Sequence, residues 1–221
     1  MTDDNATIDF LFDGPADAAA AIALAHGAGA PMDTPFMAGI AGRLGAAGMR
    51  VARFEFPYMA LRRVDGRKRG PDRPPVLLDA WRRVTDRLAG PAPLFVGGKS
   101  MGGRYASLFA AEPEVRGLAG VIALGYPFHP PGKPERLRTE HLGRLNAPML
   151  IVQGERDSFG TREEVARYDV PDDVRIAWAP DGDHSLQPRK SSGRSTEENL
   201  DLAALAITRF VADLVPGFRN F

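Results

Sequence analysis

Short apolar runs that alternate with amphipathic segments are the feature that most constrains how this chain can fold. The apolar runs predict strands at residues 8–12, 21–25, 49–56, 93–96, 118–124, 149–152 and 174–179. Helical spacing separates them at residues 34–47, 76–88, 101–111, 161–168 and 196–214. The inner strands are apolar on both faces, which is typical of a mostly parallel sheet covered by helices on both sides. We therefore predict an α/β fold, with Thr34 and Thr196 as caps of their helices.

The length and the charge balance limit the classes of protein that fit this pattern. A chain of 221 residues fits a single domain, residues 1–221. The 28 Lys and Arg residues balance the 28 Asp and Glu residues, which argues against broad binding to nucleic acid or to anionic membranes. The chain has no cysteine, which excludes disulfides, thiolate metal sites and a cysteine nucleophile.

The ends of the chain and its apolar runs carry no sign of export or of membrane insertion. The first residues, Met1-Thr2-Asp3-Asp4-Asn5, are acidic and polar, unlike a signal peptide. The longest uncharged run, at 117–132, has 16 residues and contains three prolines, which is too short and too broken to span a bilayer. We therefore expect a soluble, cytoplasmic protein.

The sharpest motif is Gly98-Lys99-Ser100-Met101-Gly102, between a predicted strand and a predicted helix. It matches G-x-S-x-G, a tight turn in which the glycines leave room for a strained serine with an exposed hydroxyl. Ser100 is therefore the candidate nucleophile. The alternative is that Ser100 only caps the helix that follows.

A serine nucleophile needs a base, and the base needs an acid to orient it. In folds with such an elbow, the acid and then the histidine follow the serine along the chain. Asp157 follows the strand at 149–152, and His184 follows the strand at 174–179. The other histidines would break the order, so we predict Asp157 as the acid and His184 as the base. Three nearby acids remain alternatives to Asp157: Glu155, Asp181 and Asp183.

Acyl transfer also needs backbone N–H donors for the oxyanion. One donor is expected at Met101, directly after the candidate nucleophile. The second is expected at Ala28, in the run His26-Gly27-Ala28-Gly29 that follows the strand at 21–25. The alternative for this run is a plain tight turn.

These motifs together resemble those of the α/β-hydrolase superfamily. The segments around Asp157 and His184 resemble its dienelactone-hydrolase-like branch, from which the chain departs by having Ser100 in place of a cysteine. More narrowly, residues 98–104 and 125–134 are similar to a small α/β-hydrolase-like family. That family includes bacterial proteins, a testis-expressed protein and a subunit of a chromatin-modifying (NSL) complex.

The resemblance implies an α/β-hydrolase fold and a carboxylesterase-like serine hydrolase. Its substrate would be a small ester, thioester or lactone, cleaved through an acyl-enzyme without a cofactor or metal. About 25 residues, 125–148, separate two adjacent strands, so we expect no full lid domain. We then expect Tyr126, Phe128 and His129 to line an open mouth as substrate-binding residues; the alternative is that they pack the loop itself.

A basic loop at residues 58–75 is also expected to reach this mouth. Its six basic residues outnumber its two acids by four: Arg62, Arg63, Arg67, Lys68, Arg69 and Arg73 against Asp65 and Asp72. The loop could clamp an anionic substrate or an acidic partner, or be merely solvated. Arg138 and His141 are weaker additions to the same patch.

Two other functions compete with the hydrolase prediction. Gly98-Lys99-Ser100 also spells the end of a phosphate-binding loop, but the glycine needed five residues before Gly98 is Pro93. The second competing function is that of a catalytically silent scaffold or protein-interaction module with the same fold. Labelling of Ser100 by a fluorophosphonate would distinguish the enzyme from the scaffold.

Overall fold

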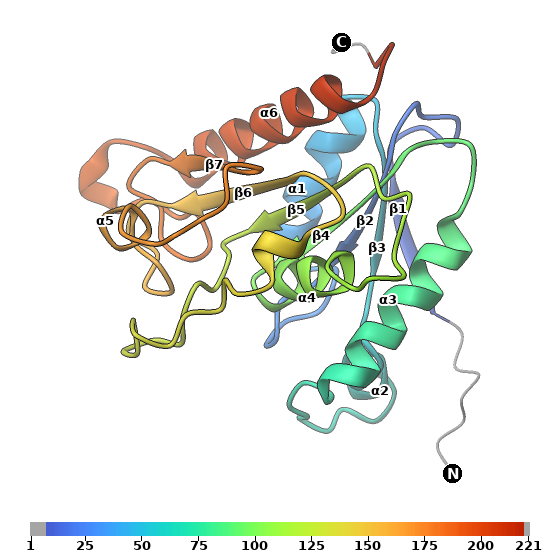
Figure 1. The fold of residues 1–221 in the computed structure, drawn as a ribbon, viewed down its shortest axis with the longest axis horizontal. Coiled ribbons are helices and arrows are strands. Elements are labelled where there is room, and N and C mark those ends of the chain that lie inside the picture. The colour runs from blue at the N-terminus through green and yellow to red at the C-terminus, as the bar shows by residue number, and fades with distance from the viewer. Residues whose placement is uncertain (1–7, 219–221) are drawn as a thin grey trace.

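A seven-stranded sheet forms the centre of the computed structural model, which describes residues 8–218 (Figure 1). The strands are β1 Phe10–Asp13, β2 Ala21–Ala25, β3 Arg50–Phe54, β4 Leu94–Lys99, β5 Gly120–Leu124, β6 Met149–Gly154 and β7 Val174–Ala179. They lie in the order β1-β3-β2-β4-β5-β6-β7, and only β1 runs antiparallel to its neighbour. The mostly parallel sheet predicted from the apolar runs is thereby confirmed. The acidic opening at residues 1–5 lies outside the described residues.

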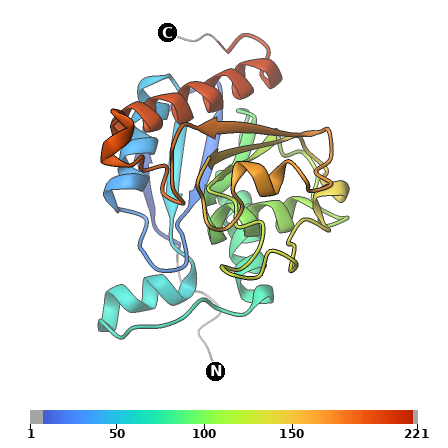
Figure 2. The ribbon, with the colours of Figure 1, turned by 90° about the vertical axis from the view of Figure 1, so that its left-hand side faces the viewer.

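Helices cover both faces of the sheet, as predicted. Helices α1 (Pro35–Ala46) and α6 (Thr196–Leu214) pack together on one face, and α3 (Pro74–Leu88) and α4 (Met101–Ala110) pack on the other. Figure 2 shows α1 and α4 on opposite sides of the strands. The remaining helices are α2 (Pro57–Asp65) and α5 (Arg162–Val165). Within residues 8–218, no helix combines the length and apolarity needed to cross a membrane.

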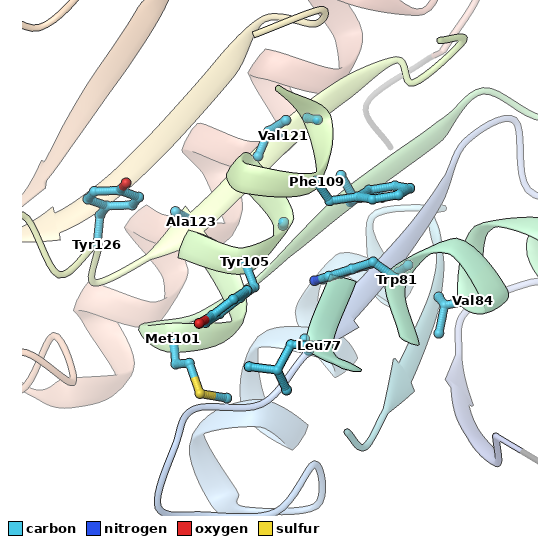
Figure 3. Packing of buried hydrophobic residues seen from close by; sticks show 14 of the residues in the cluster. Leu77, Trp81, Val84, Met101, Tyr105, Phe109, Val121, Ala123 and Tyr126 are labelled. Carbon is cyan, nitrogen blue, oxygen red and sulfur yellow. The ribbon is translucent and has the colours of Figure 1, made fainter. Parts of the chain in front are cut away.

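The interface between α3 and α4 anchors the helix that follows Ser100. Trp81 of α3 stacks on Phe109 of α4, with ring centroids 6.3 Å apart and planes 16° from parallel. Figure 3 shows Leu77 beside these rings, with Met101 and Tyr105 projecting from the first turns of α4. These side chains are buried, so the start of α4 is held firmly against the sheet.

Helix α2 occupies much of the segment that we predicted as the basic loop at residues 58–75. Pro57 stands at its first turn, and Gly66 ends it in the left-handed conformation. Tyr58 and Met59 are buried beneath it, whereas the rest of the helix is mostly exposed. The sequence pattern missed this helix because two buried side chains give no visible helical period.

Helix capping was predicted correctly at one helix and misplaced at another. Thr34 accepts a hydrogen bond from the Met37 N–H at the start of α1. Helix α6 is capped by Ser195, not by Thr196. The Ser195 hydroxyl and the Glu198 carboxylate each accept a hydrogen bond from the other's backbone N–H.

No lid domain is inserted between β5 and β6. The segment 125–148 contains only one short 3₁₀ turn, Leu142–Arg144. This confirms the prediction from the connection length, and it leaves the carboxyl ends of the strands without a covering domain.

Candidate active site

Ser100 lies at the junction of β4 and α4 in a strained backbone conformation, with φ 50° and ψ −113°. The chain can turn this tightly because glycines flank the serine. A side chain at Gly98 would place its Cβ 2.4 Å from the Ala25 carbonyl oxygen, and one at Gly102 would lie 2.6 Å from it. The end of β2 is thus pressed directly against the elbow.

Adding one methyl group at this contact should destabilise the fold. Gly102→Ala is expected to lower the free energy of unfolding by about 1–3 kcal/mol, because the backbone must shift to admit the Cβ. Gly42→Ala is the matched control, since Gly42 is an exposed α1 residue where an added Cβ would meet nothing within 4 Å. That control should be stabilising by about 0.5–1 kcal/mol. Urea titrations would measure both, and equal effects would contradict the close-approach argument.

The structure brings Ser100, His184 and Asp157 into one hydrogen-bonded chain. The Nε2 atom of His184 lies 2.8 Å from the Ser100 hydroxyl oxygen. Its Nδ1 atom lies 2.8 Å from Oδ2 of Asp157. The imidazole also packs against the ring of Phe159, with centroids 4.3 Å apart. Three loops that leave the carboxyl ends of β4, β6 and β7 supply the three side chains.

Asp157 is fully buried, and its carboxylate is held by other donors besides the histidine. Oδ1 accepts a hydrogen bond of 2.9 Å from the Phe159 N–H, and Oδ2 accepts one of 2.9 Å from Nε2 of Gln153. Gln153 also joins the Tyr126 backbone through both of its amide atoms. Our sequence reasoning missed Gln153, although a polar residue at the end of an otherwise apolar strand was a usable signal.

The three alternative acids have other partners. Glu155 binds Arg162 at 2.6 Å and accepts the Asp181 N–H. Asp181 binds Arg189, and Asp183 accepts the backbone N–H groups of the residues that follow His184. Within the described residues, Asp157 alone of these four carboxylates contacts the His184 side chain.

The segments that carry the two expected oxyanion donors border Ser100. Met101 is the first residue of α4, so its N–H has no intrahelical acceptor. The loop after β2 lies beside it, since a Cβ at Gly27 would be 3.9 Å from the Ser100 Cβ. The Ala28 carbonyl accepts a 2.9 Å hydrogen bond from the Tyr58 hydroxyl, which ties this loop to α2.

His26 shapes this loop rather than taking part in proton transfer with Ser100. It is fully buried, and burial lowers the pKa of its imidazole. Its Nε2 accepts a hydrogen bond from the Phe56 N–H at 3.2 Å, while Nδ1 lies 2.6 Å from the Gly27 carbonyl oxygen. The neutral ring therefore ties the loop after β2 to the end of β3.

Lys99 is a second residue that our sequence reasoning missed. Its ammonium donates a hydrogen bond to the His184 carbonyl and lies 5.1 Å from the Phe36 ring centroid. Burial lowers the pKa of Lys99 to about 8, although the charges of Asp157 and Asp183 raise it. The residue before the elbow serine thus holds the backbone of the candidate base.

The expectation that Tyr126, Phe128 and His129 line an open mouth is wrong. All three side chains are buried and pack the segment that carries them. The Tyr126 hydroxyl donates to the Arg138 carbonyl at 2.8 Å, and Phe128 packs so closely on Gly160 that a Cβ there would lie 2.7 Å from the ring. His129 Nδ1 lies 2.8 Å from the next carbonyl, that of residue 130. The partners of Tyr126 and Phe128 come from other segments of the chain, which the local sequence did not reveal.

The basic segment at 58–75 is partly neutralised within the chain. Arg63 binds the buried Glu55 at 2.7 Å, and Arg69 binds Asp65 at 2.5 Å. The first pair anchors α2 to the end of β3. Asp65 is already subtracted in the excess of four, so only the ion pairs of Arg63 with Glu55 and Asp33, which lie outside the segment, lower the surface charge below that count.

His141 is buried beneath α4 among cations. Its Nε2 lies 2.8 Å from the Ser107 hydroxyl and 3.5 Å from that of Tyr126. Burial, together with the charges of Arg104 and Arg144, lowers the pKa of His141 to about 4. The folded protein therefore keeps this imidazole neutral where an unfolded chain would protonate it.

This buried histidine should make the protein less stable in mild acid. Between pH 6.5 and 4 the unfolded chain binds more protons at His141, so the free energy of unfolding falls as the pH falls. The contribution lost between pH 7 and pH 5 is about 2 kcal/mol. Urea titrations at both pH values should show a decrease that is smaller by this amount in His141→Gln. An identical decrease in wild type and variant would rule out the histidine as its source.

Solved structures of several hydrolases share this fold at low sequence identity. Dienelactone hydrolase from Anabaena variabilis superposes with a TM-score of 0.69 at 20% identity, covering 94% of this chain and 92% of that one. Est1E from Butyrivibrio proteoclasticus, with bound ferulic acid, superposes with a TM-score of 0.68 at 15% identity, covering 94% and 95%. An α/β serine hydrolase without a lid from Xanthomonas campestris gives 0.66 at 20% identity, covering 95% and 90%.

A family model described as alpha/beta hydrolase domain matches residues 18–212. The matched range includes the sheet from β2 to β7, the elbow, and the loops that carry Asp157 and His184. The chain therefore belongs to the alpha/beta hydrolase family.

Proposed function

We propose that this protein is a serine hydrolase that cleaves small ester-like substrates through an acyl-enzyme. The observation that carries the proposal is the chain of two 2.8 Å contacts from Ser100 through His184 to Asp157. The strained serine at its end supports the same conclusion, because strain of this kind is found where a nucleophile must be exposed.

In the proposed mechanism, the Ser100 oxygen attacks the substrate carbonyl while His184 Nε2 accepts the hydroxyl proton. The buried Asp157 carboxylate holds the Nδ1–H tautomer and stabilises the imidazolium. The N–H groups of Ala28 and Met101 donate to the oxyanion. His184 then returns the proton to the leaving group, and water hydrolyses the acyl-enzyme by the same steps. No step uses a cofactor or a metal ion.

We further infer that the substrate is a carboxylic ester, a thioester or a lactone. Support comes from neighbours of the same fold, one named as a dienelactone hydrolase and one with bound ferulic acid. We also propose that the chain is related to the small family that includes a testis-expressed protein and an NSL-complex subunit. The basis is the similarity of residues 98–104 and 125–134 to the motifs of that family. The absence of a lid favours short substrates that reach Ser100 directly.

A fluorophosphonate probe tests the proposal, because it labels only an activated serine. We expect the wild type to be labelled and Ser100→Ala to be silent. Ser185→Ala is the matched control, since Ser185 is exposed and adjacent to His184 but does not contact it through its side chain, and its labelling should be unchanged. If the folded wild type is not labelled, the hydrolase proposal fails, and the silent scaffold becomes the better description.

A further inference from the structure

Lys99 is a charged residue beside the candidate nucleophile that the proposed mechanism does not use. It is the last residue of β4, and its side chain is partly buried. Within residues 8–218, no carboxylate forms an ion pair with its ammonium. The ammonium instead donates a hydrogen bond to the backbone carbonyl of His184. A cation is thus directed at a neutral acceptor on the loop that carries the candidate base.

The same side chain contacts three loops at the carboxyl ends of the strands. Its ammonium binds the loop after β7 through the His184 carbonyl. Its stem lies beside the loop after β2, since a Cβ at Gly27 would be 3.5 Å from the Lys99 Cγ. The turn after β5 also passes close by, because a Cβ at Gly125 would lie 3.0 Å from the ammonium and 2.6 Å from the His184 carbonyl oxygen. Lys99 therefore links the loop of the expected oxyanion donor Ala28 to the loop of the base.

An aromatic ring and a glycine turn define the place of the ammonium. The Lys99 Nζ lies 5.1 Å from the ring centroid of Phe36, in the first turn of α1, a favourable contact for a cation. Gly125 has φ 66°, a conformation that favours glycine, and it presents no side chain between the ammonium and the His184 carbonyl. Both features leave the hydrogen bond to His184 unobstructed.

Keeping a charge at this position is energetically unfavourable. Burial lowers the pKa of Lys99 to about 8, although the charges of Asp157 and Asp183 raise it. An apolar side chain of similar length would fill the space without desolvating an ammonium. What the ammonium adds is a charge-assisted hydrogen bond, which is stronger than one from a neutral donor. The arrangement therefore favours a firmly held His184 backbone.

We propose that Lys99 is a positioning residue for the hydrolase reaction, whose ammonium holds the His184 loop so that the imidazole stays aligned with Ser100. This inference rests on the proposed function. The imidazole must meet two partners at once, the Ser100 hydroxyl and the Asp157 carboxylate, each at 2.8 Å. A displacement of about 1 Å in such a site lowers a rate by about 100-fold. A backbone held at the base itself prevents that displacement.

Lys99→Met is expected to lower kcat for 4-nitrophenyl butyrate about 10-fold to 100-fold, with KM nearly unchanged. Fluorophosphonate labelling should slow by the same factor, because it also requires His184 to accept the Ser100 proton. The urea midpoint should stay close to that of the wild type, since the lost hydrogen bond is offset by the removal of a desolvated charge. A purely structural lysine would instead lower stability. Lys190→Met is the matched control, because Lys190 is an exposed lysine of the segment after His184, and it should keep the wild-type rates.

Proton NMR gives a readout of the same contact that does not depend on turnover. The His184 Nδ1 proton, which is hydrogen-bonded to Asp157, should give a sharp low-field resonance in the wild type. In Lys99→Met this resonance should broaden through faster exchange with water, whereas in Lys190→Met it should stay sharp. If Lys99→Met does not fold, Lys99→Gln, which has a neutral and shorter side chain, takes its place with the same expected results.

The outcomes separate this inference from the proposed function. Wild-type kcat or an unchanged resonance in Lys99→Met overturns the positioning role of Lys99 and leaves the hydrolase intact. A folded wild type that is neither labelled nor active on the ester overturns the hydrolase. The resonance then still decides whether Lys99 holds the His184 loop.

Discussion

Ser100→Ala is expected to lower kcat for 4-nitrophenyl butyrate by on the order of 10³-fold to 10⁶-fold. The alanine removes the oxygen that lies 2.8 Å from His184 Nε2, so no acyl-enzyme can form. Stopped-flow and steady-state assays with the nitrophenyl ester would measure the loss. The fold should persist, because the change removes a single atom at a partly exposed position.

Ser185→Ala is the control for this substitution, and it should retain nearly full turnover. Circular dichroism and thermal unfolding must show both variants folded before rates are compared. If Ser100→Ala keeps more than a tenth of the wild-type rate, Ser100 is not the nucleophile.

Asp157→Asn is expected to reduce kcat by about 10³-fold to 10⁴-fold, and to lower the free energy of unfolding by about 1–3 kcal/mol because Gln153 Nε2 then faces a second donor. One oxygen of Asp157 accepts the Phe159 N–H, and the other accepts both Gln153 Nε2 and the His184 ring. With asparagine, the amide oxygen is required by Phe159, so the amide nitrogen faces His184. The imidazole must then accept at Nδ1 and carry its proton on Nε2, where it cannot take the proton of Ser100.

Glu155→Gln and Asp183→Asn are the matched controls. Each removes a charge from one of the loops that carry Asp157 and His184, and neither carboxylate contacts the His184 side chain. They should retain at least about a third of the wild-type kcat. The dependence of kcat on pH should also show whether Asp157→Asn has lost the group, the His184 imidazole, that acts as a base near neutral pH. If Glu155→Gln lowers kcat as much as Asp157→Asn does, Glu155 rather than Asp157 is the acid that orients His184.

Features that depend on neighbouring residues were predicted well from the sequence. The strand–helix alternation, the parallel sheet and the elbow around Ser100 follow from hydrophobic period and from the steric need for glycine, which are local properties. The small number of residues between β5 and β6 correctly indicated that no lid domain is inserted. By contrast, no sequence pattern indicated that α2 begins at Pro57, because only two of its side chains are buried.

The exposure of side chains after β5 depended on distant partners, so it was predicted wrongly. The segment after β5 is too short for a lid domain, and this led us to expect Tyr126 and Phe128 to line an open mouth. In the structure, Gly160 leaves room for Phe128, and the Arg138 carbonyl accepts from Tyr126. A residue far along the chain thus decides whether an aromatic side chain faces solvent, and no local pattern carries that information.

The sequence by itself determined the fold class and the order of Ser100, Asp157 and His184, because strand ends in a parallel sheet meet at one edge. Only the tertiary structure decided which carboxylate contacts the histidine and how Gln153 and Lys99 hold the site. These are contacts between segments separated by up to 85 residues. Short hydrogen bonds and the satisfaction of buried charges are set by packing in three dimensions, which residue spacing along the chain does not specify.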